Sequence, residues 1–167
     1  NIKNAEILIR ELLDTHQQPV LAEEFIEGKE ICFYIIGNDK NMEMFSALEI
    51  FLKTDESYFL THLYTADLKN KSDDQTYRFM TDKLPKQEVC KIRNIFHSLV
   101  KMDYIRIDCR LKNNELYLIE LTPDAHIGAD SGFGYIADNM DLSYQDVFNS
   151  IIRTSLSYYQ SPTASLK

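Results

Sequence analysis

The chain has 167 residues, a length that fits one domain with a sizeable buried core. Hydrophobic residues make up 44% of it and aromatic residues 11%, which excludes a disordered chain. Its net charge of -8 argues against a nucleic-acid partner, because a phosphate backbone requires clustered lysine and arginine.

Cysteines and the chain ends bear on the compartment and on the domain limits. Three cysteines, odd in number, widely spaced and set among apolar residues, are Cys32, Cys90 and Cys109. They favour reduced thiols in the core of a cytoplasmic protein. No apolar run is long enough to span a membrane and no signal peptide is present, so we expect no membrane partner. The start at Asn1, without methionine, predicts a fragment of a longer chain, folded over residues 1–159 with a polar tail over 160–167.

The first half of the chain predicts one helix followed by strands. A helix capped by Asn4 would carry an apolar stripe of Ala5, Leu8, Ile9, Leu12 and Leu13. Strands are predicted over residues 20–26, 30–36 and 42–53, and the run at 37–40 is a strong turn signal.

The second half predicts helices around a central hairpin. Residues 54–84 lack periodicity and form a long polar segment, which is typically functional or disordered. Pro85 begins a helix, a short helix follows Ser131, and the capping-box pattern at 143–146 opens a last helix. Since the strands cluster and are joined mostly by hairpins, we expect an α+β fold, a mainly antiparallel sheet with packed helices.

The central hairpin consists of residues 104–111 and 116–121. In the first strand Arg106, Asp108 and Arg110 alternate with apolar residues, as in a strand with one polar and one apolar face. A three-residue loop over 113–115 keeps the apolar residues of both strands on one side. The predicted pairs are Asp108 with Glu120, Cys109 with Ile119, Ile107 with Leu121, and Arg106 with Thr122.

Two carboxylates directly opposite each other repel and destabilise a sheet. A cation between Asp108 and Glu120 would remove this repulsion, and carboxylate oxygens suit Mg²⁺ or Mn²⁺. Alternatively, Arg106 and Arg110 neutralise the pair in an ordinary surface salt network. The residues alone leave both interpretations open.

Five segments, in this order, resemble a known family. They are VLAEEFIEGKE (20–30), YTADLK (64–69), YIRIDCR (104–110), LYLIEL (116–121) and SGFGYIADNMDLSYQDVFNSII (131–152). Together they resemble the C-terminal part of ATP-grasp enzymes of the D-alanine–D-alanine ligase type. The resemblance implies an ATP-dependent carboxylate–amine ligase: ATP phosphorylates a carboxylate, an amine attacks the acyl-phosphate, and an amide, ADP and phosphate result.

The resemblance also implies roles for individual residues. Asp108 and Glu120 match the Mg²⁺ ligands, and Arg106 matches an arginine that stabilises the transferred phosphoryl group and the tetrahedral intermediate. Lys69 matches a lysine that reaches the nucleotide phosphates, although most lysines in charged runs are simply solvated.

The nucleoside and acceptor sites follow in the same way. Glu23, Phe25 and Ile26 match the adenine-binding hinge, and Glu30 matches the acid that holds the ribose hydroxyls. Alternatively, Glu23 and Glu30 lie on the solvated face of an edge hairpin. Ser131 matches a residue that contacts the acceptor carboxylate, or it only caps the following helix.

Two departures from the family pattern affect the expected activity. Thr122 replaces the asparagine that completes the second metal site, and Asp124-Ala125-His126 replaces a proline-glycine turn. Thr122 therefore motivates an alternative function, a non-catalytic nucleotide-binding or interaction module. A hydrolytic metal centre that uses His126 is a weaker alternative. The partners expected are ATP and small-molecule amino acid or carboxylate substrates, and the assembly considered is a homodimer.

Overall fold

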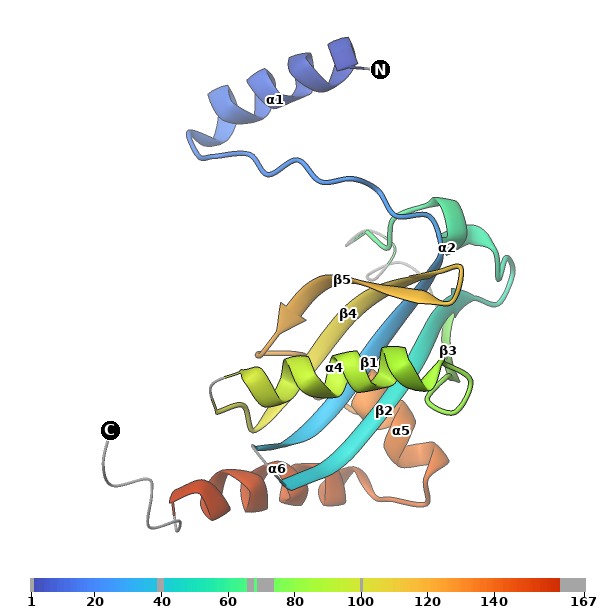
Figure 1. The fold of residues 1–167 in the computed structure, drawn as a ribbon, viewed down its shortest axis with the longest axis vertical. Coiled ribbons are helices and arrows are strands. Elements are labelled where there is room, and N and C mark those ends of the chain that lie inside the picture. Colours follow the sequence, from blue (N-terminus) through green and yellow to red (C-terminus); the bar gives the residue numbers. More distant parts are fainter. Residues whose placement is uncertain (1, 39–40, 66–67, 69–73, 100, 160–167) are drawn as a thin grey trace.

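The computed structural model of the chain describes residues 2–38, 41–65, 68, 74–99 and 101–159. Its described residues form an antiparallel five-stranded sheet with helices on both faces, as Figure 1 shows. The predicted α+β class is therefore confirmed. No helix among the described residues combines the length and the apolar character needed to cross a membrane.

The sheet has the strand order β3-β2-β1-β4-β5, with β1 at its centre. The strands are β1 (Lys29–Asn38), β2 (Asn41–Leu52), β3 (Gln75–Phe79), β4 (Tyr104–Lys112) and β5 (Glu115–Thr122). Because side chains alternate along a strand, β1 contributes to two cores. Ile31, Phe33 and Ile35 point to one face, and Cys32 and Tyr34 point to the other.

Helix α4 (Lys86–Ser98) covers the first of these faces. Its Ile92 and Phe96 pack against the odd-numbered residues of β1 and against Ile105 and Ile107 of β4. The helix was predicted to begin with Pro85, and it begins one residue later, at Lys86. Pro85 is the N-cap residue, with a φ of -56° and a non-helical ψ of 131°. Burial of this apolar surface is the main term that holds α4 on the sheet.

Helices α5 (Gly132–Asn139) and α6 (Tyr144–Tyr159) cover the opposite face. Phe133 and Val147 are buried there beside Tyr34. The predicted capping box at the start of α6 is confirmed. The backbone N–H of Asp146 donates to Ser143 Oγ at 3.2 Å, and the backbone N–H of Ser143 donates to Asp146 Oδ2 at 2.9 Å.

Three sequence-based expectations are wrong. Helix α1 (Ile2–His16) begins before Asn4, so Asn4 does not cap it, and none of its residues is buried. Residues 20–26 form no strand, since they have no partner strand and run as a linker between α1 and β1 (Figure 1). The segment 54–84 was expected to lack helices and strands, but its described residues contain helix α2 (Tyr58–Thr61) and strand β3. Pairing with β2 stabilises β3, which its own periodicity did not predict.

Candidate functional site

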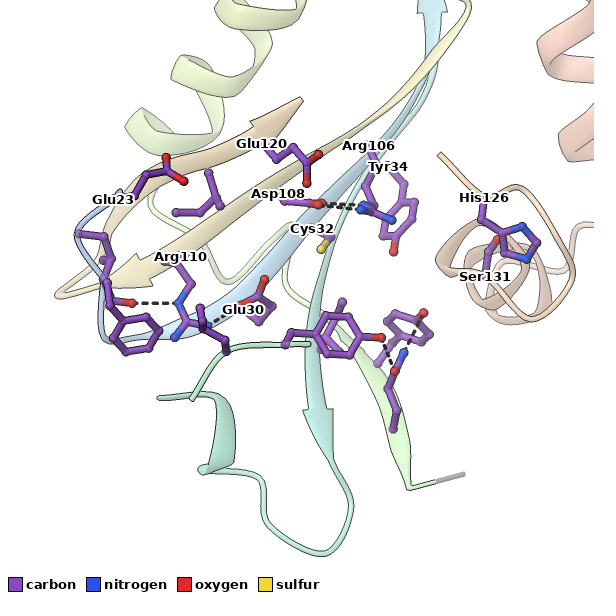
Figure 2. Close-up of a pocket in the computed structure, with 18 of the residues that line it drawn as sticks. Glu23, Glu30, Cys32, Tyr34, Arg106, Asp108, Arg110, Glu120, His126 and Ser131 are labelled. Carbon is purple, nitrogen blue, oxygen red and sulfur yellow. Dashed lines mark hydrogen bonds and ion pairs between the residues drawn. The ribbon is translucent and has the colours of Figure 1, made fainter. Parts of the chain in front are cut away.

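A cavity of about 750 Å³ opens on the α5 side of the sheet. Eight of the predicted site residues line it: Glu23, Phe25, Ile26, Glu30, Arg106, Asp108, Glu120 and Ser131. Figure 2 shows Glu23 and Arg110 at one end, Asp108 and Glu120 near the middle, and His126 and Ser131 at the other end. Thr122 does not line the cavity, and Lys69 falls outside the described residues.

The β4–β5 hairpin places the two acidic residues opposite each other. Asp108 pairs with Glu120, and both side chains line the cavity, as the alternation predicted. The predicted pairs of Arg106 with Thr122 and of Ile107 with Leu121 are also confirmed.

The loop and one pair of the hairpin differ from the prediction. Asn113 and Asn114 have φ values of 51° and 65° and form a two-residue turn, because asparagine tolerates this left-handed backbone. Cys109 pairs with Leu118 rather than with Ile119. Ile119 is the extra residue of a β-bulge, and beyond it the predicted pairing of Asp108 with Glu120 is restored.

The Arg106 guanidinium holds Asp108 through two parallel hydrogen bonds. Arg106 Nε donates to Asp108 Oδ1 at 2.6 Å, and Nη2 donates to Oδ2 at 2.7 Å. Burial lowers the pKa of Arg106, but the hydrogen bonds and the charge of Asp108 outweigh it and raise this pKa. Arg106 thus neutralises Asp108, as the salt-network interpretation required, whereas Arg110 pairs with Glu30 instead of the acidic pair.

The floor and one wall of the cavity are polar but neutral. Burial raises the pKa of the Cys32 thiol and of the Tyr34 hydroxyl well above their ordinary values. On the wall, the Tyr64 hydroxyl donates to Gln75 Oε1, and Gln75 Nε2 donates to the Tyr77 hydroxyl at 3.3 Å. Burial also raises the pKa of both wall tyrosines, so these groups stay protonated at neutral pH.

The charges that line the cavity are mainly negative. Among the residues that the structure describes, six carboxylates and two guanidinium groups line it: Glu23, Glu24, Glu30, Asp108, Glu120 and Asp130 against Arg106 and Arg110. An anionic ligand would therefore require cations beyond those of the described lining residues.

The donor set fits a hard divalent cation that is shared with a ligand. The described residues contain no cluster of three or more His, Cys, Asp or Glu side chains placed to hold a metal. Mg²⁺ commonly takes only one or two carboxylates and fills its other positions with water and phosphate oxygens. Asp108 and Glu120 meet this requirement. Thr122 Oγ1 is buried without a hydrogen-bond partner among the described residues, and its role as a ligand stays a prediction.

The loop before α5 forms the far end of the cavity. Ser131 Oγ accepts a hydrogen bond from Gly134 N at 3.3 Å, so Ser131 caps α5 and also lines the cavity. His126 Nε2 lies 2.9 Å from Asp130 Oδ1, and this contact lowers the pKa of Asp130. His126 is thus paired within its own loop, and the hydrolytic metal centre gains no support among the described residues.

Sequence reasoning missed several residues of the cavity. Arg110 has a readable signal, because it follows Arg106 and Asp108 on the polar face of the same strand. Gln75 and Tyr77 have none, since they reach the cavity only through the pairing of β3 with β2.

Comparison with known proteins identifies the family. Residues 1–153 match the family model described as D-ala D-ala ligase C-terminus. None of the curated proteins matches the chain. A structure of D-alanine–D-alanine ligase from Bacillus anthracis complexed with ATP superimposes with a TM-score of 0.63 and 21% identity, covering 91% of this chain and 47% of that chain. A second structure of the ligase from this organism gives a TM-score of 0.54 and 24% identity, covering 81% of this chain and 42% of that chain.

These likenesses confirm the fold, and the chain spans about half the length of the structures that it matches. The family model covers most of the chain. We conclude that the chain belongs to the D-alanine–D-alanine ligase C-terminal family of ATP-grasp proteins.

Proposed function

We propose that this chain is the C-terminal portion of the ATP-grasp domain of an ATP-dependent carboxylate–amine ligase, with residues 1–159 as the folded part. The observation that carries the proposal is the pairing of Asp108 with Glu120 on one open side of the sheet, with Arg106 beside them. The ATP in the Bacillus anthracis ligase structure supports a nucleotide as the ligand of the same fold.

Asp108 and Glu120 would hold Mg²⁺ or Mn²⁺ in this function. When bound, such an ion neutralises phosphate charge and polarises the phosphoryl group. The excess of carboxylates in the cavity supports this assignment, because ATP would otherwise be repelled.

The nucleoside would lie at the end of the cavity that the linker closes. Phe25 and Ile26 offer an apolar wall and backbone groups for adenine, and Glu23 lines the cavity beside them. Glu30 would accept hydrogen bonds from the ribose hydroxyls. Lys69 is proposed to reach the phosphates from the resemblance alone.

The reacting groups would lie between Arg106 and Ser131. The γ-phosphoryl group of ATP passes to the substrate carboxylate, the amine of the second substrate then attacks the acyl carbon, and phosphate leaves. Arg106 is suited to the charge that develops on the phosphoryl and tetrahedral oxygens, because the bonds of Nε and Nη2 to Asp108 fix its guanidinium plane and do not use Nη1. Ser131 would orient the acceptor carboxylate. The substrates are small amino acids or carboxylates.

The proposal also includes the cellular compartment and the oligomeric state. Three free cysteines support the reducing cytoplasm, although Cys90 is exposed rather than part of the core as expected. A homodimer stays a prediction.

The test separates a ligase from a non-catalytic module. The full-length protein is titrated calorimetrically with ATP and Mg²⁺, and phosphate release is then measured with and without a panel of amino acids. Release that depends on amino acids supports the ligase, and Glu120→Gln should abolish it. Nucleotide binding without such release would support the binding module that Thr122 motivates, and absence of binding would reject both functions.

A further inference from the structure

Arg110 is the most completely buried charged side chain of the cavity, with 4% of its surface exposed. It lies on β4 opposite Glu30 of β1, and its Nη1 forms an ion pair with Glu30 Oε2. A guanidinium at this depth is costly unless most of its donors are satisfied. Its other contacts therefore indicate what it is buried for.

These contacts reach two segments far away in the sequence. Arg110 Nε donates to the carbonyl of Ile26 at 2.9 Å, and its guanidinium carbon lies 4.9 Å from the centre of the Phe25 ring. Arg110 Nη2 donates to the carbonyl of Phe59 in α2 at 2.7 Å. One side chain thus joins Glu30, the linker before β1, and α2.

Neither of the two segments is ordered by a sheet. The linker has no strand partner, and α2 is a single turn of four residues. Bonds from a buried guanidinium to their carbonyls are charge-assisted and directional, so they help to hold these backbones, together with the hydrogen bond that Gly28 N donates to Leu60 O at 2.9 Å. Figure 2 shows the guanidinium between the linker and Glu30.

We propose that Arg110 is the positioning residue of the nucleoside end of the cavity. By binding Oε2, it orients the Glu30 carboxylate, and through the carbonyl of Ile26 and the ring of Phe25 it holds this part of the linker at the edge of the cavity. This inference rests on the proposed function, and it adds that Arg110 sets the preference for a ribonucleotide over a deoxyribonucleotide through Glu30.

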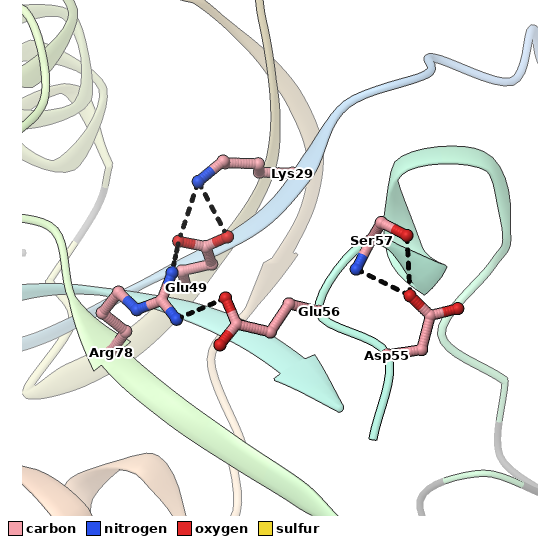
Figure 3. Close-up of polar contacts among 6 residues, drawn as sticks. All are labelled: Lys29, Glu49, Asp55, Glu56, Ser57 and Arg78. Atoms are coloured by element: carbon pink, nitrogen blue, oxygen red, sulfur yellow. Dashed lines mark hydrogen bonds and ion pairs between the residues drawn. The ribbon is translucent and has the colours of Figure 1, made fainter. Parts of the chain in front are cut away.

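Lysine cannot replace Arg110 in this role. Its ammonium keeps the charge but has three donors at one point. The guanidinium serves the acceptors of Ile26, Phe59 and Glu30 from fixed positions in one plane, and its Nη2 also donates to the carbonyl of His62 at 3.5 Å. Arg110→Lys therefore retains the ion pair while losing the geometry. A matched control is Arg78, which pairs with Glu56 at 2.7 Å and with Glu49 at 3.6 Å away from the cavity (Figure 3).

The experiment measures binding of Mg²⁺–ATP, Mg²⁺–2′-deoxyATP and Mg²⁺–3′-deoxyATP to the full-length protein by calorimetry. Arg110→Lys should weaken ATP binding about tenfold, the effect of one charge-assisted hydrogen bond. It should also reduce, towards one, the ratio of the affinity for ATP to the affinity for each of the two deoxynucleotides. Glu30→Gln should reduce the same ratio, and the double variant should reduce it no further. Arg78→Lys should leave the ratio unchanged.

A second measurement requires no variant. ATP binding to the wild-type protein should slow amide hydrogen exchange in α2, which does not itself line the cavity, and 2′-deoxyATP should slow it less. An Arg110→Lys protein that keeps the wild-type affinity ratio, or an α2 whose exchange is unaffected by ATP, would overturn the role of Arg110. A wild-type protein that binds none of the nucleotides rejects the proposed function itself and this role with it.

Discussion

Asp108 is neutralised within its own strand by Arg106, two residues before it, through bonds of 2.6 and 2.7 Å to its two carboxylate oxygens. Glu120, which lies opposite Asp108, receives no such bond from Arg106. The two members of the acidic pair therefore differ: one is part of a fixed ion pair, and the other is exposed at the cavity.

This difference predicts unequal effects of neutralising the two residues. Asp108→Asn removes the charge partner of Arg106 and should lower the free energy of unfolding by about 1.5–3 kcal/mol. Glu120→Gln should change it by less than about 0.5 kcal/mol. Both should abolish amino-acid-dependent phosphate release. Urea denaturation and the phosphate assay measure the two effects, and equal stability losses would contradict the asymmetry.

Gly132 is predicted to be required because of Tyr34. A Cβ at Gly132 would lie 2.1 Å from Tyr34 Cζ, so Gly132→Ala must displace either this ring or α5. We expect a loss of about 1–3 kcal/mol in the free energy of unfolding, as for other overpacked sites. In a Tyr34→Ala background the same substitution should cost much less, which a double-mutant cycle measures.

Gly134 supplies the control for this cycle. A Cβ there would lie 2.0 Å from the backbone oxygen of Ala129, which Tyr34→Ala does not move. The cost of Gly134→Ala should therefore be the same in both backgrounds. If Tyr34→Ala relieved both glycine variants equally, the direct contact of Tyr34 with Gly132 would not be the cause.

The sequence predicted the acidic pair because alternation along β4 is local information. The predicted loop was nevertheless one residue too long and the bulge at Ile119 was not predicted, and these two differences cancel at Glu120. The turn had a signal in Asn113 and Asn114, which tolerate positive φ. The bulge had none, because it depends on how both strands bury their apolar side chains.

Local sequence patterns could not predict how the remaining site residues are positioned. The apolar residues near Phe25 suggested a strand, but only a partner strand would have made one, and Arg110 binds this segment instead. The bonds of Arg110 span 84 positions to Ile26 and 51 positions to Phe59, distances that only the folded chain reveals. The side of the sheet on which Arg110 lies was predictable, and its partners were not.

The three thiols are predicted to differ in reactivity. Cys90 is exposed, whereas Cys32 and Cys109 are buried and have a raised pKa. The thiolate is the reactive form, so iodoacetamide at pH 8 should label one cysteine per native chain and all three after unfolding. Peptide mass spectrometry identifies the site, and Cys90→Ser should abolish native labelling. Rapid labelling of Cys32 would show that its position at the cavity floor is open to solvent.

Cys109 also predicts how stability depends on alkaline pH. Burial, followed by the charges of Asp108 and Glu30, raises its pKa from the ordinary value of 9.0 to about 12. Above pH 9 the unfolded chain loses this proton while the folded chain keeps it, so the folded state binds more protons and stability falls as pH rises. Below pH 9 both states are protonated and the thiol contributes no pH dependence.

Comparison of the wild type with Cys109→Ala isolates this contribution. From pH 8 to about pH 10.5 the free energy of unfolding of the wild type should fall by about 2 kcal/mol more than that of Cys109→Ala, since each pH unit is worth about 1.4 kcal/mol. Urea titrations at intermediate pH values measure both curves, and the exposed Cys90→Ala serves as the control that should follow the wild type. Parallel curves for the wild type and Cys109→Ala would mean that the thiol titrates equally in the folded and unfolded chains, and hence that the core between the sheet and α4 does not exclude water from Cys109.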